Sequence, residues 1–146
     1  MSELAAIADA VLAEVNGHTF ALPFTAVRTW WPRYDREDMK TLHVTVAPRG
    51  FTRKFLTRTQ DQVDYLVDVA VQQAVDPAAN ATIDPLAGLV ESIGEFFRGR
   101  RPATYTGAAC VSAAFAPGCE HGFLEEHMNT LRQFTSILTL TFRVVR

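Results

Sequence analysis

The sequence predicts an α+β fold, in which a mostly antiparallel sheet carries two helices packed on one face, in the order α-β-β-β-α-β-β. Two segments repeat apolar residues at helical spacing, one near the N-terminus and one after residue 83. Elsewhere apolar and polar residues alternate, which is typical of a strand with one buried face. A chain of 146 residues can bury a substantial core, so we expect residues 1–146 to fold as a single domain.

Both helices have recognisable boundaries. Ser2 can cap the first, and we expect Asn16-Gly17 to end it in a left-handed conformation. The second is expected to start at Asp84-Pro85, as an N-cap followed by a proline at the first helical position. The apolar face of the first helix comprises Leu4, Ile7, Ala8, Val11, Leu12 and Val15. That of the second comprises Leu86, Leu89, Val90, Ile93 and Phe97.

Five strands are expected from alternation. The first, at 19–31, contains Pro23, which lacks an N–H and therefore favours an edge or an interrupted strand. Strands at 41–46 and 63–71 look half-buried and antiparallel to each other. The last two are expected at 105–115, which is rich in small residues, and at 134–145.

The connection between the second and third strands is strongly basic. It carries Arg49, Arg53, Lys54 and Arg58 within ten residues. Two interpretations remain open: a solvated hairpin connection, or a loop that faces another subunit or DNA. The next strand carries Asp61, Asp64 and Asp68, an acidic stripe that is either solvated or faces a basic partner.

Trp30 and Trp31 precede a proline and an arginine. Adjacent strand residues point to opposite faces, so one ring can be core and the other exposed. An exposed tryptophan beside arginine is a candidate binding hot spot. The alternative is that the chain's own helices or loops cover both rings.

No catalytic or metal constellation is apparent. Cys119, His121 and His127, with Glu125 or Glu126, match no compact zinc pattern, so we expect no metal, no cofactor and no enzyme activity. Cys110 is expected to be a small buried hydrophobe, and both thiols to be free. The long connection 116–133 is expected to project as an arm or short helix that docks on a neighbour.

The net charge of −2 gives no overall attraction to nucleic acid or to anionic membranes. The N-terminal segment lacks the basic start and apolar run of a secretory signal, and no stretch is long enough to span a bilayer. We therefore expect synthesis in the cytoplasm and no membrane partner.

The segments Arg33–Gly50 and Asp64–Gln73 resemble small phage and prophage structural proteins of the neck and tail. The predicted element order is similar to that of tail terminator proteins, including the lambda-type terminator, which place two helices against an antiparallel sheet. The order covers nearly the whole chain, whereas the sequence motif covers about a third of it. The connection 116–133 is a departure, and it leaves open whether the protein is a terminator or another neck component.

This resemblance implies a mechanical role. Terminators form a hexameric ring on the last ring of a finished tail tube, stop polymerisation and offer a surface to the head connector. It implies a tail tube protein and a neck or connector protein as partners, non-specific contact with passing DNA, and a location at the tail–neck junction of the virion. The alternative from another class is a small ligand-binding or regulatory α+β domain that dimerises through an exposed strand edge.

Overall fold

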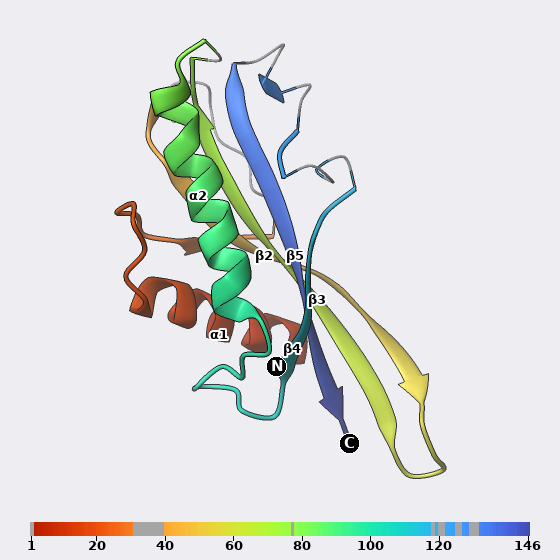
Figure 1. The fold of residues 1–146 in the computed structure, drawn as a ribbon. Coiled ribbons are helices and arrows are strands. Elements are labelled where there is room, and N and C mark those ends of the chain that lie inside the picture. The colour runs from red at the N-terminus through yellow and green to blue at the C-terminus, as the bar shows by residue number, and fades with distance from the viewer. Residues whose placement is uncertain are drawn as a thin grey trace.

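The computed structural model describes residues 2–30, 40–76, 78–117, 119, 122–124, 127–128 and 132–146. Within them the predicted fold class and element order are confirmed (Figure 1). The helices are α1 (Glu3–Gly17) and α2 (Asn80–Phe97). The strands are β1 (Val27–Arg28), β2 (His43–Phe55), β3 (Asp61–Ala74), β4 (Ala109–Phe115) and β5 (Gln133–Val145).

The described strands form one sheet in the order β1-β2-β3-β5-β4. β3, with 14 residues, occupies the centre and pairs antiparallel with β2 on one side and β5 on the other. β4 pairs antiparallel with β5 and forms one edge. β1 is the exception to the antiparallel pattern, because it runs parallel to β2 at the other edge.

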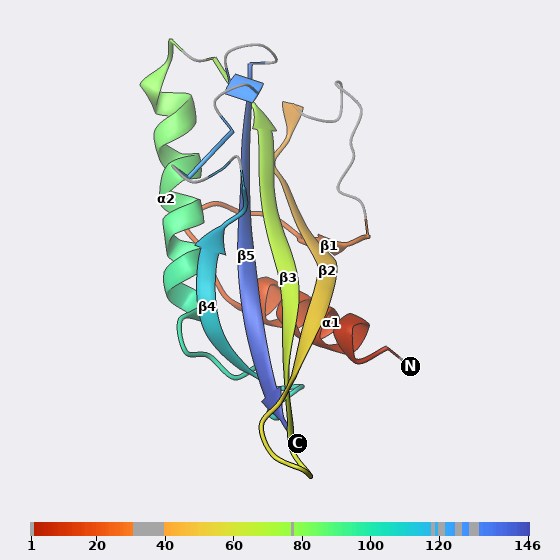
Figure 2. The same cartoon turned by 90° about the vertical axis from the view of Figure 1, so that its right-hand side faces the viewer.

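Both helices pack on the same face of the sheet (Figures 1 and 2). α1 crosses β2 and β3, and the hydroxyl of Tyr65 on β3 reaches Glu3 of α1. α2 lies over β5 and β4, where Val90 and Ile93 approach Val69. Alternate residues of a strand share a face, so Tyr65 and Val69 place the two helices on one side. A continuous apolar core fills the space between these layers.

The start of α1 is confirmed, but its expected left-handed end is wrong. The side chain of Ser2 accepts a hydrogen bond from the backbone N–H of Ala5 at 3.3 Å. Neither Asn16 nor Gly17 has a positive φ. The Asn16 amide instead bonds the backbone of Ala26, accepting from its N–H at 2.8 Å and donating to its carbonyl at 3.2 Å. Asn16 thus fixes the segment that leads into β1.

α2 buries the five residues predicted, but it begins at Asn80 rather than at Asp84. Residues that precede the helix stabilise its first turn. The N–H of Ala79 donates a hydrogen bond to the carbonyl of Asp76, and the hydroxyl of Thr82 donates one to the carbonyl of Ala79. Pro85 therefore lies inside the helix, where its missing N–H removes one backbone hydrogen bond near the exposed end.

Two strands are shorter than expected. The first was expected at 19–31, but of the described residues 19–30 only Val27–Arg28 are strand, and Phe20 belongs to a loop in which its ring packs edge-on against Phe96 of α2, with ring centroids 5.6 Å apart. β4 begins at Ala109 rather than at residue 105. Tyr105 belongs to the preceding loop, and its hydroxyl donates a hydrogen bond to Glu3 in the first turn of α1.

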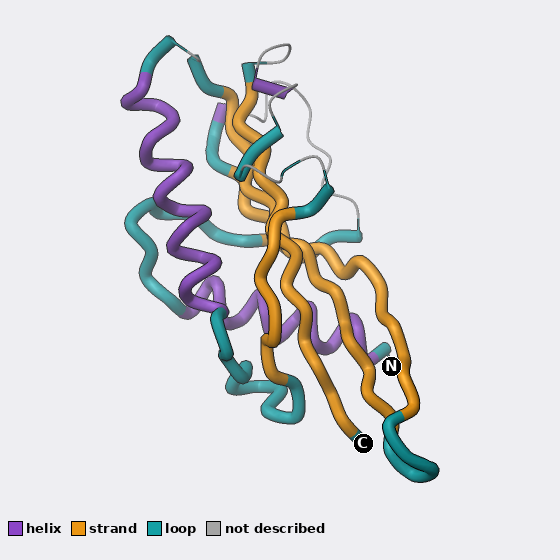
Figure 3. The backbone as a smooth tube through the Cα atoms, turned by 45° about the vertical axis from the view of Figure 1, so that its right-hand side comes forward, coloured by secondary structure: helices purple, strands orange, loops and turns teal. Residues whose placement is uncertain are grey.

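β2 is longer than expected. It continues to Phe55, so most of the basic segment is strand rather than connection. The register shifts at Arg49, between Pro48 and Gly50. Even-numbered residues of β2 face the helices before this bulge, and odd-numbered residues, beginning with Phe51, face that side after it. The hairpin of β2 and β3 extends beyond the helices (Figure 3).

A matched pair of phenylalanines should distinguish the core from this extension. Phe142 is fully buried, whereas Phe55 is 79% exposed. We expect Phe142→Ala to lower the free energy of unfolding by about 3–5 kcal/mol, because it leaves a cavity. Phe55→Ala should cost less than about 1 kcal/mol. Urea titration of both variants measures the difference, and equal losses would contradict this division.

Candidate interaction surface

The face of the sheet opposite the helices is polar, and its charges pair within the chain. Asp64 of β3 accepts two hydrogen bonds from the guanidinium of Arg143 on β5, at 2.9 and 3.2 Å. Asp68 accepts a hydrogen bond from the hydroxyl of Thr139 at 2.7 Å, and Arg49 lies 3.6 Å from the same carboxylate. Such exposed pairs add little stability, but they neutralise most of the charge on this face.

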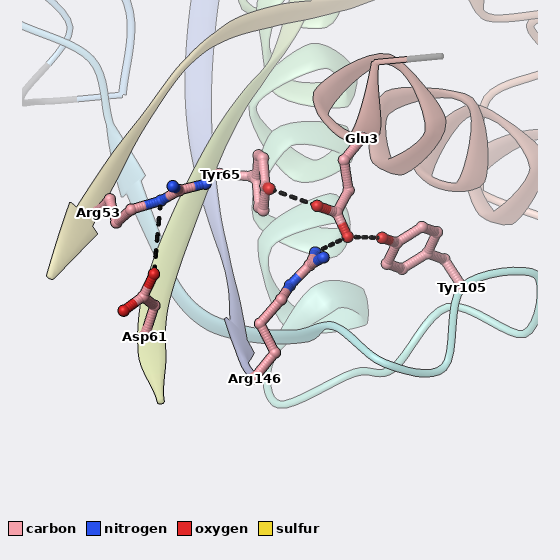
Figure 4. A network of polar contacts seen from close by, with 6 residues as sticks. All are labelled: Glu3, Arg53, Asp61, Tyr65, Tyr105 and Arg146. Atoms are coloured by element: carbon pink, nitrogen blue, oxygen red, sulfur yellow. Dashed lines mark hydrogen bonds and ion pairs between the residues drawn. The ribbon is translucent and has the colours of Figure 1, made fainter. Parts of the chain in front are cut away.

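Two of the basic residues therefore lie beside two of the acidic residues in the same subunit, although each set was a candidate for facing a partner. The bulge at Arg49 directs that side chain toward Asp68, and the guanidinium of Arg53 lies 4.0 Å from Asp61 across the hairpin (Figure 4). Separate acidic and basic surfaces do not arise from these residues. Arg143 lies opposite Asp64 on β5, a pairing that depends on strand order and register.

A second surface is the hairpin arm, which we define as residues 50–61. Its exposed apolar side chains are Phe51, Phe55 and Leu56, at 58%, 79% and 44% exposure. Lys54 and Arg58 make no ion pair with any residue in the described part of the chain. The arm thus combines uncovered apolar area with uncompensated positive charge, a composition that favours contact with another macromolecule.

The tip of the arm is an ordered turn. The N–H groups of Leu56 and Thr57 bond the carbonyl of Gln60 at 3.0 and 3.2 Å. The hydroxyl of Thr57 accepts hydrogen bonds from the N–H groups of Thr59 and Gln60. These bonds hold the exposed apolar side chains in defined positions, which reduces the entropy lost when a partner binds.

A polar cluster beside the arm joins β3 to three other segments (Figure 4), and its β3 residue, Tyr65, pairs with Phe51 of the arm. The carboxylate of Glu3, in the first turn of α1, accepts a hydrogen bond from Tyr65 at 2.6 Å. Tyr105, from the loop before β4, and Arg146, at the end of the chain, also donate to Glu3. Three segments that are distant in sequence therefore converge on the carboxylate of a fourth, α1.

The pKa values of this cluster follow from its geometry. Burial raises the pKa of Glu3, but hydrogen bonds from Tyr105, Tyr65 and Arg146 outweigh it and hold the pKa below its ordinary value. Burial and the hydrogen bond to Glu3 raise the pKa of Tyr105 to about 12. The cluster therefore consists of an ionised carboxylate and neutral phenols across a wide pH range.

Trp30 is an exposed aromatic residue near the first edge of the sheet, at 53% exposure. The guanidinium of Arg28 lies 6.0 Å from its ring and 2.5 Å from the carboxylate of Asp9 on α1. The arginine beside Trp30 is thus Arg28, whereas the expected arrangement involved Arg33. Trp31 and the segment Arg33–Met39, where the resemblance begins, lie outside the described residues.

The connection 116–133 was expected to project, but its described residues lie against the sheet. Cys119 and Met128 are buried in the core. The N–H of Leu124 bonds the carbonyl of Thr135 at 2.9 Å, and the His127 ring lies 2.9 Å from the Thr135 hydroxyl. These contacts place part of the connection on the chain's own β5. His121, Glu125 and Glu126 lie outside the described residues.

Cys110 is buried, as expected, and Cys119 is buried too; neither forms a disulfide among the described residues. Burial raises the pKa of the Cys110 thiol, which disfavours the reactive thiolate. Among the described residues no group of three or more His, Cys, Asp or Glu side chains could hold a metal ion.

Sequence reasoning missed a groove between α2 and the edge strand β4. Its volume is about 610 Å³, and residues of β4, β5 and the outer side of α2 line it. Gly94 of α2 and Ala113 of β4 are among its lining residues, and they add little side-chain volume to it. Glu91 and Glu95 lie on its rim, and Arg98 stands at one end. The small residues expected in β4 were the available signal, but strand order was needed to place them beside a helix.

Comparison with known proteins assigns no family, since neither a family model nor a curated protein matches this sequence. In the part of the chain that the structure describes, no helix has the length and apolarity that a membrane crossing requires.

The Glu3 cluster should make stability depend on pH at both extremes. The lowered pKa of Glu3 means that its contribution is present above pH 4.5 and is lost as pH falls through the folded-state value. The raised pKa of Tyr105 means that its contribution is complete below pH 10 and is lost as pH rises toward about 12.

Tyr105→Phe should therefore lower the free energy of unfolding at pH 7 by about 1–2 kcal/mol and reduce the loss of stability between pH 10 and 12. Urea titrations from pH 3 to pH 11.5 measure both effects. An unchanged pH dependence in this variant would contradict the assigned role of the cluster.

Proposed function

We propose that this chain is a structural protein of a phage or prophage virion that forms a ring on the end of the tail tube. In this role it stops polymerisation of the tube and offers the surface to which the head attaches. The hairpin arm carries the proposal, because it holds Phe51, Phe55 and Leu56 away from the core in a fixed conformation.

The composition of the arm supports a protein-binding role. Aromatic residues and arginine are enriched where proteins bind one another, and a rigid element loses little entropy on docking. An arm that meets a different surface on the next subunit makes a head-to-tail contact, and such contacts close into rings when the rotation permits. Shape and composition of the arm thus fit an assembly protein.

The observed element order adds support, since it is the order that the resemblance to tail terminators implies. The proposed assembly is a homo-hexamer at the tail–neck junction, made in the host cytoplasm, with the tail tube protein and a neck or connector protein as partners. Lys54 and Arg58 are the candidates for contact with passing DNA, where cations would hold phosphate without reading bases. The proposed role needs no cofactor and no catalysis.

A second candidate is a dimeric ligand-binding or regulatory domain. The observation in its favour is the groove of about 610 Å³ between α2 and β4, which is within the size range of small-molecule sites. Native mass spectrometry separates the two candidates, because a ring predicts six subunits and the regulatory domain predicts two.

Loss of the gene provides the direct test. We expect a phage or prophage that lacks it to make DNA-filled heads and unjoined tails, some longer than normal, because nothing blocks the addition of further tube rings. Negative-stain electron microscopy of the lysate measures tail length and attachment, and a plasmid copy of the gene is the control.

Normal-length tails joined to heads in the deletion strain would rule out the terminator role. Tails of normal length that remain unjoined would instead assign the protein to the neck, acting after tail length is set.

A further inference from the structure

The sheet has two edges that are free among the described strands. β1 pairs with β2 only at Thr45 and Val46, so the outer side of β2 in the segment Gly50–Phe55 has no described strand beside it. β4 is the outermost strand on the opposite side. Each segment is about 20 Å long, and unpaired strand edges of this length are templates for pairing with another chain.

The strand directions are compatible with pairing between copies. Successive neighbours from β2 through β3 and β5 to β4 are all antiparallel, so β2 and β4 run in opposite directions. A second copy displaced sideways along the sheet, without inversion and with a shift of about four residues along the strands, brings its Gly50–Phe55 beside the first copy's β4 in antiparallel orientation. This contact joins unlike surfaces and uses each edge once per subunit, as a closed ring requires.

The side chains of the arm would then reach the groove. Phe51 lies opposite Tyr65, which faces the helices, so Phe51, Arg53 and Phe55 share that side of the strand. Lys54 points to the opposite side. In a sheet continued across two subunits, residues on the helix side of the arm lie on the α2 side of the neighbour.

The groove is complementary to these side chains. Val90, Leu138 and Phe115 supply apolar lining, and the volume of about 610 Å³ can admit a ring. The carboxylates of Glu91 and Glu95 project from successive turns of α2 at the rim, where Arg98 offsets part of their charge. The arm is cationic and apolar, and the groove is anionic and apolar.

We propose that the groove between α2 and β4 receives the hairpin arm of a second copy of this chain. Gly50–Phe55 adds to the free edge of β4, Phe51 and Phe55 occupy the groove, and Arg53 faces Glu91 and Glu95. The inference rests on the proposed ring and specifies its subunit contact.

Charge exchange tests this contact in solution. Sedimentation velocity over a range of concentrations should show the wild-type chain associating beyond a dimer. Arg53→Glu and the double variant Glu91→Arg/Glu95→Arg should each raise the dissociation constant at least about tenfold. Combining the three substitutions in one chain should restore much of the association, because opposite charges face each other again.

Matched controls lie on the same elements. Lys54→Glu makes the same charge change one residue away, on the other side of the strand, and Asp84→Arg changes an exposed residue of α2 outside the groove. Both should leave association near the wild-type value. All substituted residues are exposed, so thermal melts should report an unchanged fold.

Three results would overturn the inference: a wild-type chain that stays monomeric at the highest concentration, equal effects of Arg53→Glu and Lys54→Glu, or no recovery in the combined variant. None of these results bears on the phenotype of the deletion strain, which tests the proposed function independently. Conversely, a deletion strain with normal joined tails would remove the proposed role and leave a measured arm–groove contact standing.

Discussion

The rest of the structure depends on β3, whose alternate side chains form the floor of the core and whose backbone is paired on both sides. Val63, Tyr65, Val67, Val69 and Val71 are all nearly inaccessible to solvent. A one-residue slip of this strand would expose all five and bury Asp64 and Asp68, so its register is strongly specified. Both helices pack across this row of side chains, and β2 and β5 take their registers from it.

The bulge at Arg49 links this constraint to the candidate function. Before the bulge, β2 buries Val44 and Val46 against the helices, and after it the alternation changes. Without the extra residue, Thr52 and Lys54 would lie on the helix side of the arm, and Phe51 and Phe55 on the polar face. The bulge therefore keeps the apolar side chains of the arm on the side of the sheet that carries the groove.

Charge is arranged differently on the polar face of the sheet and on the arm and groove. On the polar face, Asp64 and Asp68 are matched by Arg143 and Arg49 of the same chain, which leaves little charge to attract a partner. On the arm, Arg53 lies 4.0 Å from Asp61, whereas Lys54 and Arg58 make no ion pair among the described residues, and neither do Glu91 and Glu95 at the groove, on a different part of the molecule. This separation is what a head-to-tail contact needs, because complementary patches on one subunit must not meet within it.

The sequence by itself determined the fold class, the buried face of each helix and the alternation of β3 and β5, because these follow from local periodicity. It also indicated that residues 49–58 were too charged for the core. Tertiary structure decided where the charges go. Register places Arg49 beside Asp68, and strand order sets β4 beside α2 to form the groove.

Local pattern failed where a residue's partner lies far away in the chain. Asn16 was expected to end the helix in a left-handed conformation, but its side chain hydrogen-bonds the backbone of Ala26. The alternating aromatic residues after Thr19 predicted a strand, but Phe20 lies in a loop that packs on α2. The convergence of Tyr65, Tyr105 and Arg146 on Glu3 has no sequence signature at all. Periodicity reports which way a side chain faces within its own element, whereas only packing between elements decides which groups it meets.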